Sequence, residues 1–134
     1  MNYEAYIYET LKSLGLPMVS KGGQYINMSI EYLLSLDKYT IPNSSMINLS
    51  IANRLYLEPT SIENSIRNAI QIIWKKQKNQ SLMTTIFGPY NLQKRPCNME
   101  FLMLLYNYVH FHFEKTTNLQ KLEALWLYKK NKIS

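Results

Sequence analysis

The chain of 134 residues is long enough for one domain with its own core, and its 46% hydrophobic content excludes a disordered polypeptide. The net charge of +6 favours nucleic acid as a partner, although many lysine-rich proteins are basic without binding one. The single cysteine, Cys97, excludes an internal disulfide, and no apolar run has the length of a membrane span or the form of a signal peptide. We therefore expect a single cytoplasmic domain over residues 1–134.

Apolar residues recur at helical spacing along nearly the whole chain, and no convincing strand pattern is present. Gly15 and Pro17 are typical of a helix end. Residues 21–23 (Lys-Gly-Gly) are interpreted as a turn, and 42–45 (Pro-Asn-Ser-Ser) as a break. The predicted helices cover residues 3–14, 24–36, 46–55, 59–76, 81–87, 99–114 and 119–130. The predicted fold is a compact all-α domain of about six helices with an additional C-terminal helix.

The fourth predicted helix has two candidate starting points. Pro59 suits the first position of a helix, where no intrahelical N–H bond is lost, whereas Thr60 and Glu63 are spaced for a capping box. Further along, Asn98 is predicted to cap the helix that follows it. The Thr-Thr-Asn segment at 116–118 is predicted to separate that helix from the last one.

The same fourth helix has one apolar and one polar face when its residues are placed about 100° apart. The apolar residues that share one stripe are Ile62, Ile66, Ala69, Ile70 and Ile73. The residues on the opposite face are Thr60, Ser61, Asn64, Asn68, Gln71 and Lys75, with Arg67 on the flank. Asn and Gln can each form two hydrogen bonds with adenine in the major groove, and Arg67 can bond guanine or a phosphate. The alternative is that these side chains only solvate a surface helix.

The preceding helix supports the DNA-binding interpretation. In a helix-turn-helix the two helices cross at a small residue, and Ala52 supplies one beside Ile51. Leu55 and Leu57 lie on either side of the turn, where Tyr56 occupies the position often taken by glycine. This spacing is a weak motif alone, but together with the basic charge it favours a helix-turn-helix that reads DNA.

Several short segments occur in the order and spacing of one known family. They are Leu14-Gly15-Leu16-Pro17, Lys21-Gly22, Ile51-Ala52-Asn53-Arg54, Ile62-Glu63, Ile66-Arg67-Asn68-Ala69-Ile70, Trp74, Ile86-Phe87-Gly88, Pro96, Asn98 and Glu100-Phe101. Through these segments, residues 7–114 resemble the DNA-binding effector domain of the master sporulation response regulator of Bacillus and Clostridium relatives.

The resemblance implies an all-α domain of about six helices built around a helix-turn-helix, in a transcription factor that binds short promoter boxes, often as tandem copies. The positions that would read bases and phosphates match Ser61, Glu63, Asn64 and Arg67. Glu63 and Arg67 keep the family's residue types, whereas Ser61 and Asn64 replace arginines. Because an arginine that reads guanine is worth about 1–3 kcal/mol at its base pair, the family's usual box is not carried over, and Asn64 would suit adenine better.

Two features depart from the family. The resemblance begins almost at Met1, so we expect no phosphoacceptor domain in this chain and no control by phosphorylation within it. Residues 116–134 are additional. Their apolar residues, the C-terminal stripe, are Leu119, Leu122, Leu125 and Trp126. Either this stripe packs on the domain, or it forms a dimer or contacts a partner protein.

No other pattern predicts chemistry. His110 and His112 lie two positions apart and point to different sides of a helix, so a shared metal is not expected. Cys97 has no histidine near it in the sequence, which argues against a catalytic thiol. We expect no enzyme, and neither a cofactor, a metal, a small-molecule substrate nor a membrane partner.

We therefore predict a sequence-specific transcriptional regulator that inserts the helix at 59–76 into the major groove of double-stranded DNA, as a homodimer or as tandem copies. The residues predicted to face the DNA are Thr60, Ser61, Glu63, Asn64, Arg67, Asn68 and Gln71. The residues predicted to contact phosphates are Lys75, Lys76, and Lys94 or Arg95. The alternative is an interaction protein, or an antagonist, that keeps the fold and pairs with another regulator through its last helix.

Overall fold

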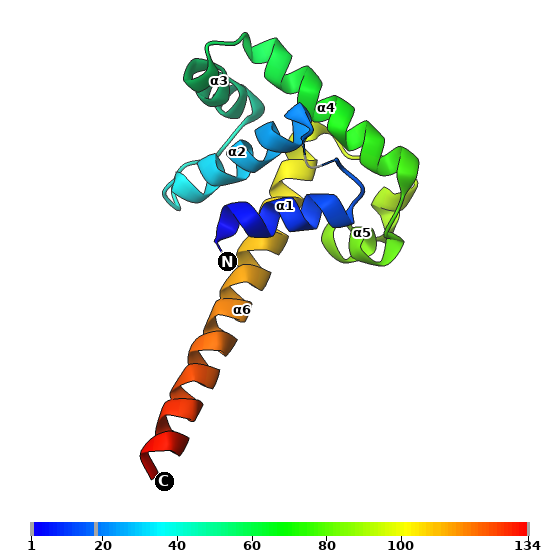
Figure 1. The fold of residues 1–134 in the computed structure, drawn as a ribbon. Coiled ribbons are helices and arrows are strands. Elements are labelled where there is room, and N and C mark those ends of the chain that lie inside the picture. Colours follow the sequence, from blue (N-terminus) through cyan, green and yellow to red (C-terminus); the bar gives the residue numbers. More distant parts are fainter. Residues whose placement is uncertain (1, 18, 134) are drawn as a thin grey trace.

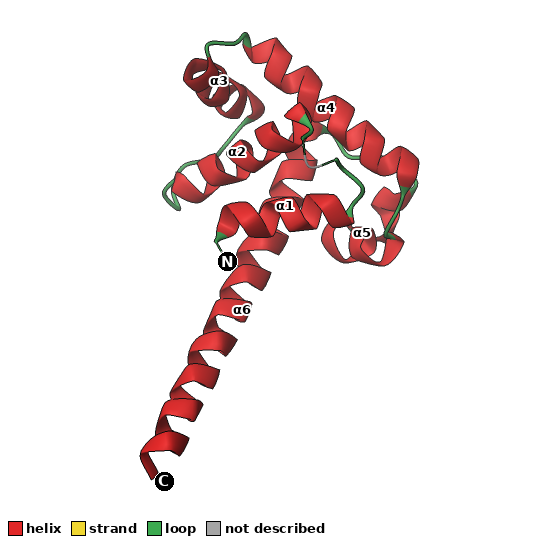
Figure 2. Ribbon diagram, viewed as in Figure 1, coloured by secondary structure: helices red, strands yellow, loops and turns green. Residues whose placement is uncertain are grey.

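The computed structural model of the protein describes residues 2–17 and 19–133, and these residues form helices and connecting loops without a strand (Figures 1 and 2). The predicted all-α class is confirmed. The helices are α1 (Tyr3–Ser13), α2 (Lys21–Ser35), α3 (Ser44–Leu55), α4 (Pro59–Lys76), α5 (Gln80–Phe87), the short 3-10 helix η1 (Pro89–Leu92) and α6 (Asn98–Ile133). No described helix combines the length and the apolar character that a membrane span requires.

Short polar side chains cap several of these helices at their N-termini. The residues that accept a backbone N–H of the first turn, ahead of α1, α2, α3 and α5, are Asn2, Ser20, Asn43 and Asn79. Each cap satisfies an N–H group that has no partner within its helix, so these residues determine where the helices begin. The cap at Asn43 is the reason that α3 starts two residues earlier than predicted.

The predicted turn at 21–23 is wrong, because these residues form the first turn of α2. Gly22 instead serves a contact between helices. A Cβ atom at this position would lie 2.4 Å from the backbone oxygen of Ser65 and 2.6 Å from the Cβ of Ala69. The glycine therefore lets α2 approach α4 closely, a role that two adjacent glycines in a sequence do not distinguish from a turn.

The core lies where α2 packs against α1, α3, α4 and α6. The residues that α4 contributes are Ile62, Ile66, Ala69, Ile70, Ile73 and Trp74, and its four buried isoleucines are at most 1% exposed. Burying four such side chains contributes on the order of 6–12 kcal/mol before entropy is counted. This burial fixes the rotation of α4 about its own axis and leaves the opposite face toward solvent.

α6 continues beyond the point where the sequence suggested an end. The predicted interruption at 116–118 is wrong, because the backbone stays helical from Asn98 to Ile133. Threonine and asparagine each lower helix stability by less than about 1 kcal/mol relative to alanine, which a helix without proline or glycine tolerates. The second half of α6 projects away from the rest of the domain (Figure 1).

Of the two alternatives for the C-terminal stripe, packing on the domain is wrong. The exposed fractions of its four residues lie between 49% at Leu125 and 62% at Leu122. At about 100° per residue, the stripe is turned by roughly 100° from the side of α6 that enters the core. That core side is marked by Phe101, Leu105 and Val109, all of which are buried. The stripe therefore does not continue the core face of its own helix.

α1 holds α6 at the point where α6 leaves the domain. The ring centroid of Phe113 lies 4.1 Å from that of Tyr3 and 5.9 Å from that of Tyr6. The Tyr3 hydroxyl lies 3.4 Å from Nδ1 of His110. Burial, assisted by the neighbouring Tyr108, raises the pKa of Tyr6 to about 12. The packed domain therefore extends along α6 as far as Phe113.

Candidate nucleic-acid interface

Residues 56–58 join α3 to α4. Tyr56 adopts the left-handed backbone conformation, with φ of 56° and ψ of 43°. The next residue, Leu57, donates its backbone N–H to the carbonyl of Ala52 at 3.0 Å. Ala52 is 1% exposed, and α3 and α4 pack against each other. The chain thus turns within a few residues and presents α4 beside α3.

The N-terminus of α4 has no side-chain cap. The helix begins at Pro59, and Glu58 occupies the N-cap position without a capping hydrogen bond. The alternative capping box of Thr60 and Glu63 does not form, because the Glu63 carboxylate accepts from Arg67 instead. Pro59 has no N–H group, and the N–H of Ser61 donates to the carbonyl of Glu58 at 3.0 Å. In the first turn the backbone N–H of Thr60 is therefore left for an anion such as a phosphate.

The polar face of α4 is exposed along its length. Its exposed residues are Thr60, Ser61, Asn64, Arg67, Asn68, Gln71 and Lys75, and Glu63 is half-buried at its edge. In the part of the chain that the structure describes, the side chains of Asn68 and Gln71 form no hydrogen bond. The amides of this face are thus outside the core, and these two can serve an external partner.

Arg67 is held between two side chains of its own helix. Its Nη2 donates to Oε1 of Glu63 at 3.1 Å, and its Nη1 donates to Oδ1 of Asn64 at 3.0 Å. Because both members of the ion pair are about half exposed, it contributes little to stability, but it orients the guanidinium group. A carboxamide oxygen has two lone pairs, so Asn64 can accept from Arg67 and from a base at the same time.

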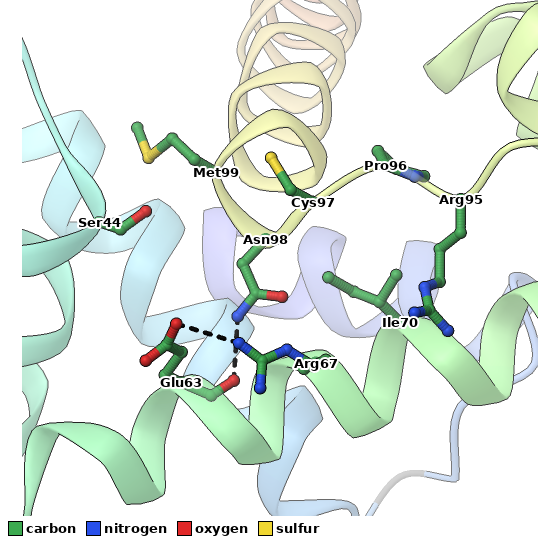
Figure 3. A pocket seen from close by; sticks show the side chains of 9 residues that line it. All are labelled: Ser44, Glu63, Arg67, Ile70, Arg95, Pro96, Cys97, Asn98 and Met99. Carbon is green, nitrogen blue, oxygen red and sulfur yellow. Dashed lines mark hydrogen bonds and ion pairs between the residues drawn. The ribbon is translucent and has the colours of Figure 1, made fainter.

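A hollow of about 350 Å³ lies between α4 and the loop that leads into α6 (Figure 3). Its lining residues are Ser44, Glu63, Arg67, Ile70, Arg95, Pro96, Cys97, Asn98 and Met99. Arg95 extends from the loop toward α4, so two guanidinium groups, those of Arg67 and Arg95, border one hollow (Figure 3). At its other side, Nδ2 of Asn98 donates to the backbone oxygen of Glu63 at 2.9 Å and ties the start of α6 to α4 (Figure 3).

The lysines predicted to contact phosphates are not all on one surface. Lys75 is exposed on the polar face of α4, and Lys94 is exposed in the loop beside Arg95. Lys76 lies on another side of α4, where its Nζ donates to the carbonyl of Gly15 at 3.0 Å. Lys76 would have to leave this carbonyl to contact a phosphate.

Residues 7–109 match the family described as "Sporulation initiation factor Spo0A C terminal". The match runs from α1 into the first part of α6, and so it includes α3, α4 and the loop that carries Arg95. The chain belongs to this family. Spo0A C-terminal domains are DNA-binding effector domains of transcription factors and are not enzymes, which confirms the resemblance inferred from the sequence. The exposed second half of α6 lies beyond the matched residues.

Sequence reasoning did not assign Asn98 to this surface of the Spo0A C-terminal domain. It predicted that Asn98 caps its own helix, whereas α6 begins at Asn98 and the side chain bonds α4. In the sequence, an asparagine that caps its own helix and one that bonds a neighbouring helix both stand ahead of an apolar run. Only the packing of α6 against α4 distinguishes the two roles. Elsewhere in the described residues, no group of His, Cys, Asp or Glu is placed to hold a metal, and Nε2 of His110 instead lies 3.7 Å from Oε1 of Glu114.

Proposed function

We propose that this member of the Spo0A C-terminal family regulates transcription by sequence-specific DNA binding, with α3, the turn at 56–58 and α4 acting as a helix-turn-helix. The observation that carries the proposal is the amide-rich, exposed face of α4, directly opposite a stripe of buried isoleucines. The buried stripe anchors α4 to the domain, and the exposed face enters the major groove.

The middle of α4 reads the base edges. Asn64, Asn68 and Gln71 each carry an amide that can bond N6 and N7 of adenine together. Arg67 lies next to Asn64 and reads a guanine or holds a phosphate. Because Glu63 already orients the guanidinium group, Arg67 loses less conformational freedom when it binds.

Phosphates on the two sides of the groove bind the flanks of α4. At the N-terminus of the helix, the backbone N–H of Thr60 acts together with the hydroxyls of Thr60 and Ser61. Lys75 contacts the backbone further along α4, and Lys94 and Arg95 contact it from the loop before α6. These contacts position the helix but select no sequence.

A second candidate function is an interaction protein that has lost base reading and pairs with another regulator through α6. The replacement of two arginines by Ser61 and Asn64 favours it, and so does the exposure of the C-terminal stripe. DNA reading is favoured over it because the family consists of DNA-binding domains and the polar face of α4 is open to solvent. Either function would be carried out in the cytoplasm.

Selection of bound sequences from a random DNA pool tests the proposal, and the expected result is one enriched motif that contains adenines. On that motif, Asn64→Ala should weaken binding by about 1–3 kcal/mol, roughly 5- to 150-fold, because it removes a bidentate contact with one base. Arg67→Ala should also lower the preference for the motif over unrelated DNA. The measurement is a pair of titrations, one with the motif and one with scrambled DNA.

Asn107→Ala is the matched control, because it removes the same group from an exposed position on α6 and should leave both titrations unchanged. Equal binding of the unmodified protein to all sequences would refute base reading. In that case the interaction function would stand, and pull-down with and without residues 116–134 would identify the surface that it uses.

A further inference from the structure

The second half of α6 exposes an apolar surface. Phe111, which is 61% exposed, precedes the C-terminal stripe on the same side of the helix, and the Trp126 of the stripe is 59% exposed. In the described residues, nothing from the domain covers these side chains, since α6 projects away from it (Figure 1). A contiguous exposed apolar surface of this kind marks an interaction site more often than a scattered exposed leucine does.

The two ends of this surface differ in charge. At its base lie the exposed Glu114 and Lys115, whose opposite charges balance. At its far end lie the exposed Lys129 and Lys130, and Nζ of Lys130 is 5.0 Å from the ring centroid of Trp126. The middle is apolar, so the surface goes from neutral through apolar to basic along one helix.

We propose that the C-terminal stripe docks against the same stripe of a second copy of this chain, with the two α6 helices antiparallel. A surface with an apolar middle and one basic end can pair with itself after a twofold rotation without bringing the two basic ends together. Antiparallel pairing places Lys129 of each copy beside Glu114 of the other. Parallel pairing would instead bring the lysines of the two copies together, which repels them.

The area of the stripe suits a reversible dimer. Phe111 and Trp126 are about 60% exposed, so each offers roughly 90–150 Å² of surface to a partner. With the three leucines of each copy, two copies together would bury on the order of 1,000 Å², which is near the lower limit for a specific interface. We therefore expect a dimer whose population depends on protein concentration. In the antiparallel arrangement, the two domains lie at opposite ends of the helix pair.

Sedimentation equilibrium of the full chain over a range of concentrations tests the pairing. The expected result is a monomer–dimer equilibrium. Leu122→Glu should raise the dimer dissociation constant by about tenfold or more, because it places a carboxylate in the middle of the interface. Leu127→Glu is the matched control: Leu127 is 46% exposed on a different side of α6, and this variant should leave the constant unchanged.

Charge reversal tests the antiparallel orientation. Glu114→Lys should weaken the dimer, and Lys129→Glu should do the same. The double variant, Glu114→Lys with Lys129→Glu, should restore it, because positions 114 and 129 then again carry opposite charges. A double variant weaker than both single variants would rule out the antiparallel arrangement. All of these side chains are exposed, and circular dichroism checks that each variant keeps its helical content.

A chain that remains monomeric at high micromolar concentration would overturn the proposal, as would a dimer unaffected by Leu122→Glu. If a monomeric chain binds vesicles of anionic phospholipid and Leu122→Glu abolishes that binding, the stripe is a membrane-surface element and not a dimer interface. Either result leaves base reading by α4 untouched, because the Asn64 titrations test that property separately.

Discussion

Tyr56 holds the turn between α3 and α4 in a backbone conformation that suits glycine, with φ of 56°. This conformation costs a residue with a Cβ about 1–2 kcal/mol. A glycine avoids that cost, but it lowers the free energy of unfolding by about 0.4–1 kcal/mol because it increases the conformational entropy of the unfolded chain. The Tyr56 side chain is 96% exposed, so little packing is lost on its removal. We therefore expect Tyr56→Gly to raise the free energy of unfolding by about 0.5–1 kcal/mol in urea denaturation.

Two substitutions separate backbone strain from other effects of this change. Tyr56→Ala removes the same ring but keeps the strained conformation, so it should bring no gain. Gln77→Gly relieves a similar φ of 41° but also removes the bond from Nε2 of Gln77 to the carbonyl of Leu92, so it should change stability little. A loss of stability in Tyr56→Gly would show that the exposed ring contributes more than the strain costs.

The contact between α2 and α4 depends on the absence of a side chain at Gly22. Gly22→Ala would place a Cβ 2.4 Å from the backbone oxygen of Ser65, which neither helix can relieve without moving. We expect it to lower the free energy of unfolding by about 1–3 kcal/mol, as overpacking does elsewhere. Since α4 is the helix that must shift, affinity for the selected DNA motif should fall as well.

Gly23→Ala is the matched control for this helix contact. A Cβ at Gly23 would lie no closer than 3.6 Å to its neighbours, and alanine is favoured over glycine inside a helix by up to about 1 kcal/mol. The expected result is therefore a small gain in thermal stability. Equal effects of the two substitutions would contradict the account of the α2–α4 contact.

Elements with a uniform helical pattern were predictable, and those whose role depends on a neighbour were not. The bounds of α4 were predicted correctly, because its buried apolar residues share one helical stripe and Pro59 marks its start. The start of α2 was misjudged, because the reason for Gly22 lies on α4. The continuity of α6 was missed because 116–118 resembles a break yet lacks a true helix breaker.

At the scale of the whole molecule, charge should set how DNA affinity depends on salt. Each phosphate contact made by a lysine or an arginine steepens the slope of log affinity against log salt by about 0.9. Lys94→Ala should therefore reduce this slope by roughly one and weaken binding to motif and scrambled DNA alike. Fluorescence anisotropy titrations at several salt concentrations measure both quantities.

Lys38→Ala removes the same charge at a distance from α4, since Lys38 lines a hollow with Met103 and Tyr106 of α6. It should leave the slope unchanged. If both variants lower the slope equally, the net positive charge of the whole chain attracts DNA, and the loop before α6 makes no specific phosphate contact.

The candidate interface combines residues that the sequence could and could not connect. The exposed polar face of α4 was identified from its periodicity, because residues on one helix keep a fixed angular relation. The convergence of Arg95 with Arg67, and the bond from Asn98 to α4, join segments about thirty residues apart. No local sequence pattern predicts contacts between residues that are so far apart in the chain.

By itself, the sequence determined the all-α class, the family, and which face of α4 is buried, since each follows from local periodicity or from short segments in a fixed order. Tertiary structure alone decided which cations share a surface, why Gly22 must be glycine, and that the C-terminal stripe is exposed. The physical reason is that burial and charge pairing depend on what lies opposite a residue in space. For Lys76 that neighbour is the carbonyl of Gly15, whereas the helices of the packed domain do not cover the stripe.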